Sequence, residues 1–299
     1  ALARTAELGL KGRWLSGKSP AEWGRYGAWL SQDEKRDTSA GEAPPEIFGR
    51  YAGQYEKWRP GYTPEFFDTI LGGGDRAVRA AVDVGCGTGK GVLGIASRGV
   101  QKVTGVDGDA LMLSQCAQSA AGLGLEGAVE TVVGAAERLP LPSDSYDLVT
   151  VMQAFHWFDA EQALAEARRV LVKPGGVLAV AWNDRNLASP LVDGLESIFE
   201  RYNPRYRREL KQSDAWAPVL TDGGLFELEA HTRLHNPLTL PNADALLGLV
   251  RTFSYVRNAL TEEQRAELEA EVVNLVRATH GEDPFDLNHT THLYMLRPT

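Results

Sequence analysis

Short apolar segments alternate with amphipathic stretches between residues 80 and 182, and this alternation limits the possible folds more than any other feature. Strands are predicted at 81–84, 102–106, 129–133, 146–152 and 177–182, with helices near 90–98, 110–121 and 160–171. Strands that alternate with single helices form βαβ units, in which the strands are parallel and the crossovers right-handed. The alternation therefore predicts a doubly wound α/β domain.

The residues after 220 depart from this rhythm. Segments 225–234 and 289–296 have the pattern of strands, whereas 242–258 and 262–279 have the pattern of helices. We therefore expect a seven-stranded, mostly parallel sheet with helices on both faces and a helical insertion, at about residues 240–285, between the last two strands. Helices added at such an edge commonly cover a ligand site, although simple packing is the equally open alternative.

The first 45 residues form a segment of different character. Ser19 and Pro20 predict the start of a helix, and a polar, Pro-containing stretch ends near Glu46. We expect residues 1–45 to be a helical extension packed on a main domain of residues 46–299. The extension has no apolar signal-peptide core, and its six acidic residues are atypical of a transit peptide. The expected location is cytoplasmic, with an organelle after removal of a targeting segment as the open alternative.

The charge balance argues against some partners. The 40 acidic and 31 basic residues give a formal net charge of −9, whereas a nucleic-acid-binding surface needs clustered Lys and Arg. The one basic cluster, at 201–211, could attract an anionic substrate or RNA, but a solvated helix face is the favoured explanation. No apolar run reaches the length of a membrane span, and the His spacings predict no metal site. Cys86 and Cys116 are expected to be small buried residues. The composition favours small-molecule chemistry.

The most informative motif is VDVGCGTG at residues 82–89, where a strand ends in a Gly-rich turn that leads into a helix. Asp107 closes the next strand twenty residues after Gly87, where a carboxylate can accept hydrogen bonds from both ribose hydroxyls of a nucleoside. A dinucleotide fingerprint, GxGxxG, would place its third glycine at Lys90, but the glycine is Gly89. The pattern therefore favours a nucleoside ligand other than a dinucleotide.

Two later segments follow predicted strands. Residues 134–140 could lay backbone groups along an adenine edge, and residues 147–159 place polar and aromatic side chains just past the fourth strand. In open α/β sheets, ligands bind outside the carboxyl ends of the strands. Both segments are thus expected at the same ligand site.

Taken together, these motifs resemble those of class I S-adenosylmethionine-dependent methyltransferases. The similarity is greatest to the small-molecule group that includes the ubiquinone/menaquinone and trans-aconitate enzymes. It rests on the Gly-rich motif, on an F-x-x-Y-A-x-x-Y-x-x-x-RP-x-Y lead-in at 48–62 and on AFHWFD at 154–159. It runs from about Phe48 to the end of the chain, and it implies a Rossmann-like fold with S-adenosyl-L-methionine as cofactor.

The resemblance also implies roles for particular residues. The glycines would cradle the methionine end of the cofactor, with Asp83 bracing their loop, and Asp107 would hold the ribose. Ala136 and Glu137 would line the adenine, and Gln153 would offer its backbone carbonyl to the amino group. Tyr55 and Arg59 would close over the cofactor or bind an anionic substrate. These ten positions are Tyr55, Arg59, Asp83, Gly85, Gly87, Gly89, Asp107, Ala136, Glu137 and Gln153. Ala135 stands where related enzymes often carry an acidic residue that contacts the adenine amine.

The expected reaction needs few catalytic groups, because a sulfonium methyl is already activated and the protein must chiefly position the nucleophile and exclude water. A general base is needed only for a nucleophile still protonated at neutral pH, and His156 is the best-placed candidate. A structural role for this loop histidine is the alternative.

The expected acceptor is a small molecule that carries a carboxylate, hydroxyl or acidic carbon. RNA or protein methylation, a non-catalytic protein that binds the cofactor, and a Rossmann-like oxidoreductase remain the alternatives. The chain lacks the Asn/Asp-Pro-Pro-aromatic tetrad of base-amine methylation, since its fourth strand is followed by Gln153-Ala154-Phe155-His156.

Overall fold

The computed structural model describes residues 52–73, 77–204, 206, 208, 216–257 and 259–299. In this part of the chain, seven strands form one sheet in the order β3-β2-β1-β4-β5-β7-β6. The strands are β1 (Ala80–Val84), β2 (Lys102–Asp107), β3 (Val129–Val133), β4 (Leu148–Met152), β5 (Val177–Arg185), β6 (Phe226–Leu240) and β7 (Phe285–Pro298). The first five are mutually parallel and β7 is antiparallel to both its neighbours. The predicted sheet is confirmed, whereas the predicted extension at 1–45 lies outside the described residues.

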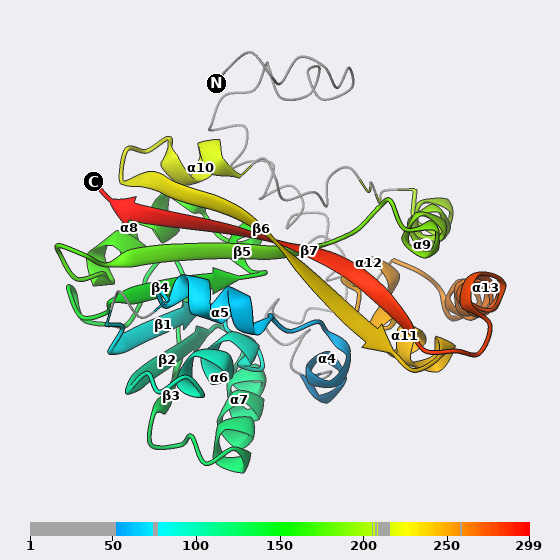
Figure 1. Ribbon diagram of the computed structural model, residues 1–299, viewed down its shortest axis with the longest axis horizontal. Coiled ribbons are helices and arrows are strands. Elements are labelled where there is room, and N and C mark those ends of the chain that lie inside the picture. The colour runs from blue at the N-terminus through cyan, green and yellow to red at the C-terminus, as the bar shows by residue number, and fades with distance from the viewer. Residues whose placement is uncertain (1–51, 74–76, 205, 207, 209–215, 258) are drawn as a thin grey trace.

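Helices cover both faces of the sheet (Figure 1). One face packs against α5 (Pro64–Ile70), α6 (Lys90–Ala96) and α7 (Ala110–Gly122), and the other against α8 (Ala160–Val170) and α10 (Ala217–Thr221). Along β5, the side chains alternate between these two cores because successive residues of a strand point to opposite faces. The central strands are therefore buried on both sides, as parallel strands usually are.

The predicted insertion consists of α11 (Ala243–Val250), α12 (Ser254–Arg257) and α13 (Glu262–His280), between β6 and β7. Thr261 caps α13 in a reciprocal capping box with Gln264. These helices and α9 (Pro190–Tyr202) share a third hydrophobic core. In Figure 1, the long strands β6 and β7 run from the main sheet into this lobe.

Several strand boundaries differ from the sequence prediction. Strand β5 continues to Arg185 instead of ending at 182, and β7 spans Phe285–Pro298 instead of 289–296. The fourth strand starts at Leu148, because Tyr146 forms only an isolated bridge with Leu171. The strand predicted to end at 234 continues through Pro237 to Leu240. Pro237 is tolerated because β6 is the last strand of the sheet, and an edge strand has one side where a missing N–H breaks no ladder.

One short helix joins the two halves of the molecule. Helix α4 (Ala52–Trp58) contacts α7 of the main domain and α11 of the insertion. A side chain at Gly248 of α11 would collide with the Trp58 ring, so the two helices pack closely there. The carboxyl ends of β1, β4 and β5 thus face a region bounded by α4 and the insertion (Figure 1).

Candidate functional site

The Gly-rich turn between β1 and α6 has a backbone that only glycine adopts easily. Gly85, Gly87 and Gly89 have φ values of +72°, +55° and +93°. A Cβ at Gly85 would lie 2.5 Å from the Ala154 Cβ, and one at Gly89 would lie 2.3 Å from the Cys116 Sγ. At Gly87, by contrast, a Cβ would meet nothing within 4 Å. Two glycines of the motif are thus required by packing, while the third borders open space that can admit a ligand.

Asp107, at the end of β2, fastens this turn. Its Oδ2 accepts a hydrogen bond from the Gly87 N–H at 2.8 Å, and its Oδ1 accepts one from the Asp109 N–H at 2.9 Å. Each carboxylate oxygen has a second lone pair, so both can still accept from ribose hydroxyls. Burial raises the pKa of Asp107, while the backbone N–H donors oppose that shift. Asp107, which is predicted to bind the ribose, therefore also holds the backbone of the Gly-rich turn in place.

Asp83 lies behind the turn, within the sheet. Its Oδ1 accepts a hydrogen bond from the Thr150 Oγ1 at 2.7 Å, and a Cβ at Gly91 would lie 2.5 Å from its Oδ2. The carboxyl group is 1% exposed, and this burial raises its pKa to about 7. Asp83 thus joins β1 to β4 and lies against the start of α6, while its bracing of the glycine loop stays a prediction.

The raised pKa of Asp83 predicts how stability depends on pH. Between pH 4 and 7, the folded state keeps a proton that the unfolded state has lost, so the free energy of unfolding falls as pH rises through this range. Between pH 5 and pH 8, the ionisation of Asp83 should lower the free energy of unfolding by about 2–3 kcal/mol. In Asp83→Asn the fall should be smaller by that amount, as measured by urea unfolding at the two pH values. An equal fall in both proteins would contradict the assignment.

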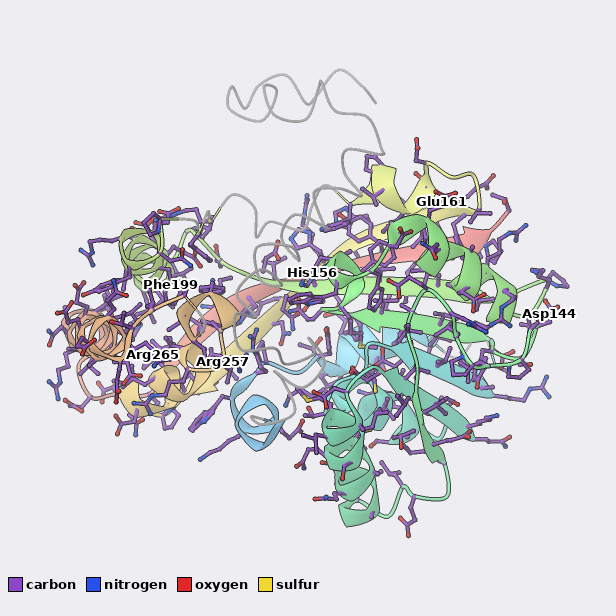
Figure 2. All side chains as sticks on the ribbon, turned by 180° about the vertical axis from the view of Figure 1, so that it is seen from behind. Asp144, His156, Glu161, Phe199, Arg257 and Arg265 are labelled. Carbon is purple, nitrogen blue, oxygen red and sulfur yellow. The ribbon has the colours of Figure 1, made fainter. Side chains whose placement is uncertain are left out.

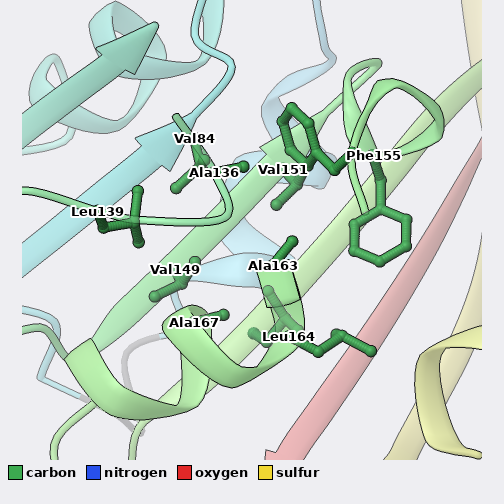
Figure 3. A pocket seen from close by; sticks show the side chains of 11 residues that line it. Val84, Ala136, Leu139, Val149, Val151, Phe155, Ala163, Leu164 and Ala167 are labelled. Carbon is green, nitrogen blue, oxygen red and sulfur yellow. The ribbon is translucent and has the colours of Figure 1, made fainter. Parts of the chain in front are cut away.

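The two segments expected at the adenine lie side by side. The Gly134 N–H donates to the Asp107 carbonyl, and the Glu137 Oε1 accepts from the Asp159 N–H at 2.9 Å. The Glu137 side chain therefore ties the loop after β3 to the segment after β4. Ala136 is buried, and with Phe155 it lines a small apolar pocket under α8, with room for about one water molecule (Figure 3). That pocket is a gap in the core, and it is too small for a nucleoside.

The segment after β4 approaches the Gly-rich turn. Gln153 has a φ of +62°, which is unusual for a residue other than glycine, and its N–H donates to the Ala181 carbonyl at 2.8 Å. His156 lies two residues past Ala154 in a 3-10 turn, η1 (Phe155–Trp157). Its Nδ1 accepts a hydrogen bond from the Trp182 Nε1–H at 3.3 Å. Figure 2 shows His156 between the sheet and the lobe that carries Phe199.

Helix α4 adds a connection that the sequence did not predict. The Glu56 Oε2 accepts a hydrogen bond from the Thr88 Oγ1 at 2.5 Å, and the Lys90 Nζ donates to the Glu56 carbonyl at 2.7 Å. The first turn of α6 and the Gly-rich motif are thereby bound to α4. Tyr55 lies in the same helix, but its side chain is outside the described part of the structure.

Arg59, which follows α4, is directed toward the insertion. Its Nε donates to the Thr252 Oγ1 at 2.9 Å and its guanidinium lies 4.8 Å from the centre of the Phe253 ring. Arg185, at the end of β5, lies 5.0 Å from the same ring centre. Two arginines from distant parts of the chain thus meet at one aromatic side chain.

The Arg185 guanidinium is buried in a polar cluster. Its Nε donates to the Glu196 Oε1 at 2.7 Å, and its Nη2 donates to the hydroxyls of Tyr206 and Tyr255 at 3.0 and 3.1 Å. Nearby, burial together with the charges of Arg185 and Arg59 lowers the pKa of His289 to about 4. Glu196 neutralises Arg185, and His289 is uncharged at neutral pH. The Asp184 carboxylate, beside Arg185, lies 3.6 Å from the His292 Nε2, so the end of β5 carries charged groups of both signs.

The sequence-predicted residues fall into two groups. The first group lies at the carboxyl ends of β1 and β2 and comprises Asp83, the three glycines and Asp107, with the Ala136–Glu137 loop, Gln153 and His156 beside them. The second group is Arg59 alone, which lies at the insertion. Glu56, Trp182 and Arg185 had no role in the prediction. Each is marked only by a contact with a residue at least 11 positions away in the chain, which no local pattern encodes.

Other expectations concern charge, metals and membranes. In the basic cluster, Arg208 pairs with Glu200 and Asp193, and Arg201 pairs with Glu271, while residues 205, 207 and 211 lie outside the described part. Cys86 and Cys116 are buried, as predicted. Among the described residues, no group of three or more His, Cys, Asp or Glu could hold a metal ion. No helix in that part of the chain has the length and apolar character to cross a membrane.

Comparison with known proteins gives consistent matches. Residues 82–180 match the protein family described as "Methyltransferase domain". An uncharacterized methyltransferase of Mycobacterium tuberculosis is 38% identical over 196 residues, which cover 61% of this chain and 75% of that protein. An uncharacterized methyltransferase of Schizosaccharomyces pombe is 28% identical over 244 residues, or 80% of this chain and 92% of the relative.

A solved structure has the same fold. It is described as that of a putative type II methyltransferase from Anaeromyxobacter dehalogenans, and it superposes with a TM-score of 0.62. The match covers 80% of this chain and 97% of the other, at 23% sequence identity. At this identity the likeness concerns the arrangement of the strands and helices.

Proposed function

Since the chain belongs to the class I S-adenosylmethionine-dependent methyltransferases, we propose that it transfers the methyl group to a small-molecule acceptor that carries a carboxylate, hydroxyl or acidic carbon. The open space at Gly87, beside the Asp107 carboxylate, suits the cofactor. We place the acceptor between η1, the end of β5 and the insertion. The closer assignment to the AFHWFD group is part of this proposal.

One observation carries the choice of a small acceptor. Helix α4 is bonded to the cofactor loop through Glu56 and leads directly to Arg59, which is bonded to Thr252 of the insertion. The loop and the insertion are thus bridged by protein, which favours a small acceptor over a folded RNA or protein chain.

The chain's own residues would act by positioning and by excluding water. The cofactor, when bound, supplies an activated methyl group. Asp107 and the glycine turn would hold the nucleoside and methionine ends, and the Gln153 carbonyl would accept from the amino group. The insertion and α4 would exclude water from the acceptor. Placing two reactants in line in a dry site provides most of the rate enhancement that this chemistry needs.

RNA and protein methylation are the second candidates. The described arginines of the basic cluster are neutralised by carboxylates, so they offer few contacts to phosphates. A non-catalytic protein that binds the cofactor would have the same cofactor-binding residues, so only an assay of methyl transfer distinguishes it from an enzyme.

The proposal is tested with S-adenosylmethionine that carries a labelled methyl group. The protein is incubated with a cell extract separated into small molecules, RNA and protein, and the labelled product is identified by mass. We expect label in the small-molecule fraction with the wild-type chain and none above background with Asp107→Ala. Label in RNA or protein alone would refute the small-molecule acceptor, and no label in any fraction would refute catalysis.

A further inference from the structure

The hydrogen bond from Trp182 to His156 bears on which ring nitrogen of His156 carries the proton. The Trp182 Nε1–H lies 3.3 Å from the His156 Nδ1. An indole nitrogen can only donate a hydrogen bond, so the His156 Nδ1 must supply the lone pair. A neutral imidazole has one N–H and one acceptor nitrogen. In the neutral ring, the proton of His156 is therefore on Nε2.

The indole itself is held firmly. Trp182 is buried on β5, and its ring stacks on Trp216 at 4.8 Å between centroids and 13° between planes. The edges of Phe155 and Tyr294 meet it at 6.4 and 6.0 Å. The indole therefore has little freedom to turn its N–H toward another acceptor.

We propose that Trp182 fixes the neutral His156 ring as the Nε2–H tautomer, in which Nε2 can donate a hydrogen bond to the acceptor but has no lone pair with which to remove a proton from it. The role of His156 toward the acceptor rests on the proposed function, whereas the assignment of the tautomer rests only on the hydrogen bond from Trp182. Trp182 is then a positioning residue and His156 is the group that touches the acceptor.

The proposal narrows the acceptor's chemistry. In the transfer, a lone pair of the acceptor forms the bond to the methyl carbon, and the carbon–sulfur bond breaks with its electrons left on sulfur. An acceptor that is already ionised has no proton to lose. A histidine that only donates therefore suits an acceptor that arrives as an anion, and among the three proposed classes this is the carboxylate. The Nε2–H would bind the carboxylate oxygen that does not react.

The tautomer can be observed without knowledge of the acceptor. In the ¹⁵N-labelled full-length protein at pH 8, two-bond ¹H–¹⁵N spectra distinguish protonated from unprotonated ring nitrogens, and His156→Gln identifies the signals of His156. We expect an unprotonated Nδ1 and a protonated Nε2 in the wild type, and a shift toward mixed tautomers in Trp182→Phe. Trp216→Phe is the control, because it removes an indole from the same stack and keeps the Trp182 N–H. A protonated Nδ1, or no change in Trp182→Phe, would overturn the proposal.

The donor role is tested by transfer to the labelled small-molecule product. A glutamine amide can place an N–H near the position of the histidine Nε2–H, but it cannot act as a base. We expect His156→Gln to stay within about 5-fold of the wild-type rate and His156→Ala to lose roughly 100-fold, as for other oriented donors. Equal losses in the two variants would overturn the donor role. If the wild type labels no small molecule, the proposed function fails, while the spectra still decide the tautomer.

Discussion

Replacing Asp107 by alanine is expected to weaken S-adenosylhomocysteine binding at least about 100-fold, because the ribose hydroxyls lose a charged acceptor worth roughly 1.5–3 kcal/mol for each hydrogen bond. The variant also releases the Gly87 N–H, which the Asp107 carboxylate holds in the structure. Titration calorimetry of the variant against the wild type measures the loss. An unchanged affinity would refute the ribose role of Asp107.

Asp147 provides the matched control. Its Oδ2 accepts from the Arg79 and Ala80 N–H groups at 2.9 and 3.0 Å, so it too ties a backbone segment with one carboxylate, but it does so at the opposite end of β1. Asp147→Ala should cost comparable stability in thermal unfolding and leave the affinity unchanged. If both variants lose affinity equally, the effect of Asp107→Ala arises from general loosening of the sheet.

The second large effect is expected at Gly87, where the backbone φ is +55° and a Cβ would meet no protein atom within 4 Å. Gly87→Ala should fold with a loss of about 1–2 kcal/mol from backbone strain. Its methyl group would occupy space that we assign to the cofactor, so the affinity for S-adenosylhomocysteine should fall by more than about 10-fold, which corresponds to about 1.4 kcal/mol.

Gly124 serves as the control for this substitution. Its φ is +68° and a Cβ there also meets nothing within 4 Å, but it follows α7, away from the turn. Gly124→Ala should show a similar loss of stability and normal binding. Normal binding by Gly87→Ala as well would mean that the open space at Gly87 does not receive the cofactor.

The fold could be predicted from the sequence because its determinants are local. The alternation of strands and helices, the capping box at Thr261 and the glycines at positive φ each occupy a few consecutive residues. The ends of the strands are also marked locally, and the sequence predicted that Asp107 ends the strand after the Gly-rich turn. In the structure, Asp107 ends β2 and accepts a hydrogen bond from the Gly87 N–H. The family and the cofactor followed from these motifs, and the comparisons confirm the enzyme class.

The acceptor side could not be predicted in this way because long-range contacts form it. Arg59 meets Thr252 across 193 positions, and Trp182 meets His156 across 26. Neither contact leaves a periodic or spaced pattern in the sequence. His156 was expected to act as a base from its place after β4 alone, and only its hydrogen bond to Trp182 supports the donor role instead. The roles of the individual site residues stay predictions until the variants are measured.

Calorimetry with two ligands tests the identity of the cofactor directly. The full-length protein is titrated with S-adenosylhomocysteine and, separately, with NAD. We predict saturable binding of S-adenosylhomocysteine at one site per chain and no measurable binding of NAD. Binding of NAD without S-adenosylhomocysteine would contradict the account.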